Sequence, residues 1–200
     1  MRLAPLLVPA LVMACSSGDS GLPGQDSAAV AAAFAAVIDG CSARLTADGS
    51  IDQAALGDGG WTRTGRTSQA GIEATTWQRS GVTGGLELVH YDGELADICM
   101  FDAQAAGSDG ADRVLTALTR KLGPPARQGK VPQGGDFLTP RKREDKHGYY
   151  WPLPRSDVYL TRFDDQNVRI EVLAMPDRAS LDQYSPDRPE SRIITVDQTD

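Results

Sequence analysis

The protein has 200 residues, with 20 lysine and arginine residues against 27 aspartate and glutamate residues, and its formal net charge is −7. This acidic balance excludes a general nucleic-acid binder, because neutralising phosphates requires a basic face. A mean hydropathy of −0.31 with a single short apolar run excludes a polytopic membrane protein. With only 2 histidines and 3 cysteines, the chain can build few transition-metal sites, and we expect no cofactor.

An almost wholly apolar segment, residues 3–14, follows Arg2 and ends directly before Cys15. As a helix it would span about 18 Å, which is too short for a bilayer core of about 30 Å but suits a cleaved signal peptide. The sequence Val12-Met13-Ala14-Cys15 resembles the lipobox of bacterial lipoproteins. In that family the cysteine is acylated and becomes the mature N-terminus.

The resemblance implies a bacterial cell-envelope lipoprotein with a signal peptide over residues 1–14 and a lipid on Cys15. Residues 15–26 are rich in glycine, serine, aspartate and proline, so we expect them to form a flexible tether between the lipid and the folded domain. Ser16 follows the cysteine where an aspartate would indicate inner-membrane retention, which favours the outer membrane and a domain facing the periplasm. A plain secretory signal, or a chance apolar N-terminus, remains the alternative.

If Cys15 carries a lipid, two cysteines remain, Cys41 and Cys99. An even number of cysteines in an exported chain indicates a disulfide. Closing that loop would stabilise the fold by about 4 kcal/mol in the chain-entropy model. Two free buried thiols are the alternative if the chain is not exported.

The sequence of the first half of the domain predicts a helix followed by strands. Residues 27–45 have apolar side chains three and four positions apart, which predicts a helix with one buried stripe made of Val30, Phe34, Val37, Cys41 and Leu45. Residues 47–60 carry a weaker helical signal, with a capping box at Ser50 and Gln53. Residues 61–64 and 72–78 have the composition of strands.

Residues 86–101 predict a β-hairpin around Asp92-Gly93, a favoured two-residue turn. That turn would place Leu86 opposite Cys99. The face that carries Cys99 should then meet the helix that carries Cys41. Asp97 falls on the same apolar face, and we expect a bulge to turn it away.

The second half repeats the order of a helix followed by strands. Residues 111–122 predict a helix, residues 126–148 a long polar excursion, and three strands follow over residues 149–153, 158–163 and 168–173. This order would suit a degenerate repeat, but the sequence shows no self-similarity to support one beyond the order of the elements. We therefore expect an α+β fold over residues 27–175, in which two main helices pack on one face of an antiparallel sheet of roughly five to six strands. Residues 176–200 read as an acidic, largely irregular tail.

Two groups of residues could carry function. A basic segment beside aromatic side chains is the best candidate for contact with a partner, and it comprises Arg141, Lys142, Arg143, Lys146 and Tyr150. His90 lies at the end of a predicted strand near several carboxylates, which would suit acid–base chemistry if a pocket existed there. The usual strand histidine at a hairpin end is the simpler interpretation.

The chain lacks the common sequence motifs of hydrolases, nucleotide-binding proteins and zinc proteases. We therefore expect a non-catalytic module that binds an envelope protein. One alternative is an inhibitor or immunity-type protein that blocks a periplasmic enzyme with the segment 126–148. Another is a hydrolase that uses His90 and a nearby carboxylate.

The lipobox-like segment yields the first prediction. Growth of the producing bacterium with a radiolabelled fatty acid should label the wild-type protein but not Cys15→Ser, because the thiol is the acylation site. Equal labelling of both proteins would contradict the lipoprotein assignment.

Overall fold

The computed structural model describes residues 25–42, 46, 50–69, 71–91, 97–131 and 146–184. The sequence predictions for residues 1–24 therefore lie outside the described residues. In chain order the elements are α1 (Ser27–Ser42), α2 (Gln53–Asp58), β1 (Trp61–Gln69), β2 (Ile72–Arg79), β3 (Leu86–Tyr91), β4 (Asp97–Gln104), α3 (Gly110–Leu122), β5 (Arg127–Lys130), β6 (His147–Pro152), β7 (Ser156–Arg162), β8 (Asn167–Ala174) and α4 (Arg178–Tyr184).

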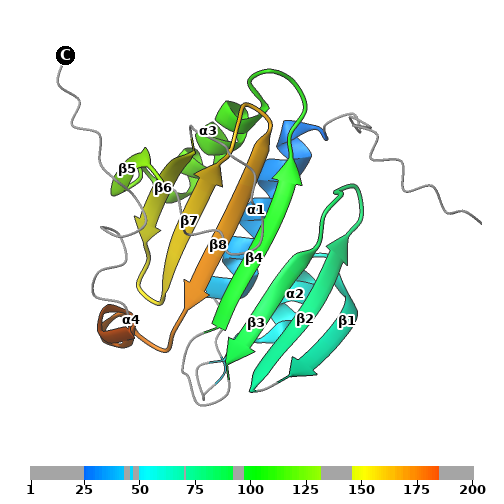
Figure 1. The fold of residues 1–200 in the computed structure, drawn as a ribbon, viewed down its shortest axis with the longest axis vertical. Helices are drawn as coiled ribbons and strands as arrows, with labels where there is room; N and C mark the ends of the chain where they lie inside the picture. The colour runs from blue at the N-terminus through cyan, green and yellow to red at the C-terminus, as the bar shows by residue number, and fades with distance from the viewer. Residues whose placement is uncertain are drawn as a thin grey trace, which may run out of the picture.

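The strands form one antiparallel sheet in the order β1-β2-β3-β4-β8-β7-β6-β5, and α1, α2 and α3 cover one face of it (Figure 1). The α+β fold with an antiparallel sheet is therefore confirmed, but the sheet has 8 strands rather than five or six. One of the additional strands is β5, which pairs with β6 inside the segment predicted as an excursion. Its sequence, RQGK, has no apolar alternation, so backbone pairing at the sheet edge decides its structure.

The two halves of the domain share an arrangement in which a long helix precedes four strands. The last strands of the two halves, β4 and β8, pair antiparallel at the centre of the sheet. Helix α1 packs over this central pair, and α3 packs beside α1 (Figure 1). Within the described residues, no helix is long and apolar enough to cross a membrane.

The disulfide between Cys41 and Cys99 is present and joins α1 to β4, with the two Cα atoms 6.5 Å apart. Both cysteines are fully buried. Beside the disulfide, the ring of Phe101 meets the rings of Phe34 and Trp61 edge to face, with centroids 5.4 and 5.1 Å away. The core therefore forms around the sulfur bridge, where the helical stripe meets the sheet.

The β3–β4 hairpin has a different register from the predicted one. Leu86 lies opposite Phe101, and Leu88 lies opposite Cys99, two positions from the expected pairing. A shift of two residues leaves every side chain on its predicted face, so Cys99 still points at α1. The pairing of the two strands begins at His90 and Asp97, and the expected turn at Asp92-Gly93 lies outside the described residues.

The aromatic run on β6 alternates between the two faces of the sheet. Trp151 faces the helices and donates a hydrogen bond from its indole to the carbonyl of Gly123, at 2.9 Å. Tyr150 faces the other way, is 4% exposed and stacks on Tyr159. Its hydroxyl donates to Asp157 at 2.8 Å. Burial, followed by the hydrogen bond to this carboxylate, raises the pKa of Tyr150 to about 12.

Helix α4 lies at the start of the segment that was predicted to be largely irregular, and it packs on the face opposite the other helices. Leu181 is buried against Leu173 and Met175. The Arg178 guanidinium lies 2.5 Å from the buried carboxylate of Asp157. Because Leu181 is the one buried side chain described in this seven-residue helix, its sequence carries no amphipathic period that would reveal it.

The buried disulfide yields the second prediction. Replacing both Cys41 and Cys99 by alanine should lower the free energy of unfolding by about 4 kcal/mol, because the unfolded chain regains the entropy of a closed loop. Urea unfolding followed by circular dichroism measures this change. Adding a reductant should bring the wild type close to the double variant and leave the variant unchanged, whereas equal stability of the two oxidised proteins would contradict the stabilising role of the disulfide.

Candidate functional site

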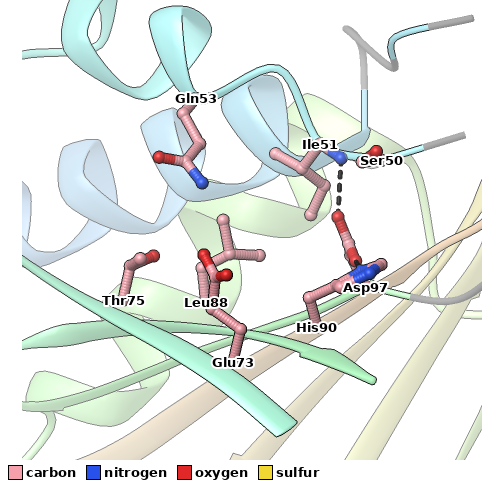
Figure 2. Close-up of a pocket in the computed structure, with 8 residues that line it drawn as sticks. All are labelled: Ser50, Ile51, Gln53, Glu73, Thr75, Leu88, His90 and Asp97. Carbon is pink, nitrogen blue, oxygen red and sulfur yellow. Dashed lines mark hydrogen bonds and ion pairs between the residues drawn. The ribbon is translucent and has the colours of Figure 1, made fainter. Parts of the chain in front are cut away.

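A pocket of about 180 Å³ lies on the helix-covered side of the sheet, between the start of α2 and the strands β2, β3 and β4 (Figure 2). Most of its lining side chains are polar, and the lining residues are Ser50, Ile51, Gln53, Glu73, Thr75, Leu88, His90 and Asp97. It therefore combines titratable groups with an apolar portion formed by Ile51 and Leu88.

Strand register brings the titratable groups together. Glu73 on β2 lies opposite His90 on β3, and His90 lies opposite Asp97 at the start of β4. Directly opposed residues of antiparallel strands point to the same face, so the three side chains form a row across the sheet. The described part of α1 ends at Ser42, and residues 50–53 lie over this row.

His90 and Asp97 form a hydrogen-bonded pair at one wall of the pocket. Nδ1 of His90 lies 2.6 Å from Oδ1 of Asp97, and the backbone N–H of Ile51 donates to Oδ2 of Asp97, also at 2.6 Å. The Asp97 side chain is 4% exposed, whereas that of His90 is 40% exposed. The carboxylate is thus held from two sides, and it fixes the imidazole that faces the pocket.

This pair replaces the bulge expected at Asp97. The carboxylate keeps its place on the apolar face because the N–H of Ile51 and the ring of His90 satisfy both of its oxygens. A buried carboxylate with two such partners avoids the cost of an unpaired charge. The sequence placed Asp97 on the correct face but gave no sign of Ile51, which lies 46 residues earlier.

The opposite wall of the pocket is formed by β2 and α2. The carboxylate of Glu73 points up from β2, and the carboxamide of Gln53 projects down from α2 (Figure 2). Oε2 of Glu73 lies 2.6 Å from Nη2 of Arg66, which is on the neighbouring strand β1. The hydroxyl of Thr75 accepts a hydrogen bond from the indole N–H of Trp77 at 3.0 Å.

Helix α2 is positioned by its cap and by close packing on α1. The carboxylate of Asp52 accepts the N–H of Ala54 at 3.0 Å, so the N-cap is Asp52 rather than the predicted Ser50. A Cβ atom on Gly40 would lie 2.7 Å from Cδ2 of Leu56, so glycine at this position allows α2 to approach α1 closely. This contact helps to hold residues 50–53 over the strands.

The other candidate residues from the sequence do not line this pocket. Cys15 and the basic residues at positions 141–143, Arg141, Lys142 and Arg143, lie outside the described residues. Lys146 directly precedes β6, in the other half of the domain, with its ammonium 5.2 Å from the ring centroid of Phe163. The Tyr150 ring is buried against β7, which corrects the expectation that it offers a recognition surface.

The structure therefore brings together His90, Asp97 and Glu73 but does not bring Tyr150 to the surface. Sequence reasoning missed Glu73, Thr75 and Gln53, because only strand pairing and the return of α2 place them beside His90. The sequence contained one indication of the site, which was the position of Asp97 on an otherwise apolar face of the predicted hairpin. In the described ranges, no three histidine, cysteine, aspartate or glutamate side chains are grouped as a metal site would require.

Comparison with protein-family models, with curated proteins and with solved structures finds no match to this chain. The function of the pocket is therefore inferred from its own chemistry.

Proposed function

We propose that this chain is a bacterial cell-envelope lipoprotein whose folded domain binds another envelope protein. The lipobox-like segment ending at Cys15 supports a lipid anchor, and the serine that follows it favours the outer membrane, with the domain facing the periplasm. The buried disulfide between Cys41 and Cys99 supports export, because structural disulfides persist in oxidising compartments. The excess of acidic over basic residues keeps such a tethered domain soluble.

The observation that carries the binding role is the pocket beside the fixed pair of His90 and Asp97. Its volume of about 180 Å³ falls below the range of about 300–1,000 Å³ that is usual for small-molecule sites. A pocket of this size accommodates a single side chain better than a whole cofactor or substrate. Because the polar wall is already hydrogen-bonded in place, a partner would bind it without a large ordering cost.

The binding role yields the third prediction. A photo-crosslinking amino acid in place of Gln53, at the rim of the pocket, should form one adduct of defined mass when living cells are irradiated. The same amino acid in place of Gln78, which is exposed on the opposite face of β2, should not form that adduct. Gel electrophoresis and mass spectrometry of the envelope fraction identify the adduct. The same adducts from both positions, or none from position 53, would contradict a partner at the pocket.

The hydrogen-bonded pair favours a second candidate, a hydrolase in which His90 is a general base. Asp97 fixes Nδ1 as the protonated nitrogen, so proton exchange with a substrate would occur at Nε2. The imidazole would take a proton from water as the oxygen attacks an acyl carbon, and would return that proton to the leaving group.

The two candidates give opposite results in the fourth prediction. For a binding module, we expect wild type, His90→Gln and His147→Gln to hydrolyse 4-nitrophenyl acetate at equal rates. A rate that falls by about 10²–10⁴-fold in His90→Gln alone would instead establish His90 as a general base. His147→Gln is the matched control, because it removes the second of the two histidines and leaves the pocket intact.

A further inference from the structure

The charges around the pocket favour a cationic group over an anionic one. Two of the eight lining side chains are carboxylates, Glu73 and Asp97, and His90 is the one lining side chain that is able to carry a positive charge. Even if both ring nitrogens of His90 carry a proton, the two lining carboxylates outnumber this single positive charge. The whole chain is acidic as well, and its field attracts cations towards the opening.

The chain already places a guanidinium on one of these carboxylates. Arg66 reaches across from β1 to Glu73, and its side chain is 61% exposed. An ion pair that exposed is weak, because water and salt screen it and the long side chain loses entropy when it is held. A basic group that enters from the pocket side can therefore compete with Arg66 for the same carboxylate.

The apolar part of the lining suits the stem of a basic side chain. Ile51 and Leu88 line the pocket between the polar groups, and Leu88 is buried. The methylene groups of lysine or arginine pack on such a surface while the charged end reaches polar partners. The carboxylate of Glu73 supplies acceptors for the N–H groups of that end.

We propose that the pocket receives a basic side chain, a lysine or an arginine, from the partner protein. This inference rests on the proposed binding function and names the chemistry that the partner presents. The stem of the side chain lies along Ile51 and Leu88, and its charged end replaces Arg66 at Glu73.

The fifth prediction uses four small probes that share a butyl chain: n-butylammonium, n-butylguanidinium, butyrate and 1-butanol. At constant pH and ionic strength, the two cations should shift the Cε1–H NMR resonance of His90 in a saturable way. Butyrate and butanol should not, and the resonance of His147, on the other half of the sheet, serves as the internal reference. Equal or stronger shifts with butyrate or butanol would overturn the inference, and so would no saturable shift with either cation.

Two substitutions with opposite expected effects sharpen the test. Glu73→Gln should weaken cation binding by about fivefold, as expected for loss of one exposed ion pair. Arg66→Gln should strengthen it by a similar factor, because it removes the competing guanidinium, and Arg63→Gln on the same strand is the matched control. A loss of stability alone would not raise the affinity of Arg66→Gln. Weaker binding in that variant would overturn the inference.

The outcome also separates this inference from the proposed function. If butyrate or butanol binds in place of the cations while the crosslink from position 53 persists, the partner occupies the pocket with a group of other chemistry. If the cations bind but no crosslink forms, the pocket recognises basic groups and the binding of an envelope protein is refuted.

Discussion

The bond between Cys41 and Cys99 fixes α1 over the middle of the sheet, and the rest of the domain is arranged around that constraint. Cys99 lies on β4, which pairs with β8 at the centre of the sheet, so the bond ties the first helix to the strand that joins the two halves. The aromatic cluster around Phe101 fills the space beside it. With α1 held there, α2 packs on it through Gly40, and residues 50–53 lie over β2, β3 and β4.

The candidate site depends on the same strand. Two residues before Cys99, Asp97 accepts the backbone N–H of Ile51 and holds the ring of His90. One strand thus carries both the covalent link to α1 and the polar link to the segment before α2. The geometry of the pocket is therefore set by buried, well-packed groups, whereas the surfaces that it offers, His90 and Glu73, remain partly accessible. A recognition site requires this combination of a rigid framework and accessible polar groups.

The sequence predicted those parts of the fold that follow from local periodicity. The stripe on α1 and the alternation on β4 placed Cys41 and Cys99 face to face, and that conclusion survived an error in register because the shift was an even number of residues. The features that the sequence did not predict are fixed by distant contacts. Backbone pairing at the sheet edge forms β5, and the ion pair with Asp157 helps to fix α4. Tyr150 is buried by packing on Tyr159, which periodicity does not reveal.

Of the site, only His90 and the proximity of a carboxylate were accessible to sequence reasoning. The partners that give the site its chemistry come from β2 and α2, and their approach depends on strand order and on the packing of α2.

The central claim is that the chain is exported and that Cys41 and Cys99 form a disulfide bond. Mass spectrometry of the full-length protein, isolated from cells after alkylation and without reduction, tests it most directly. The account predicts a bridged peptide pair containing Cys41 and Cys99, and alkylation of both as free thiols would contradict it.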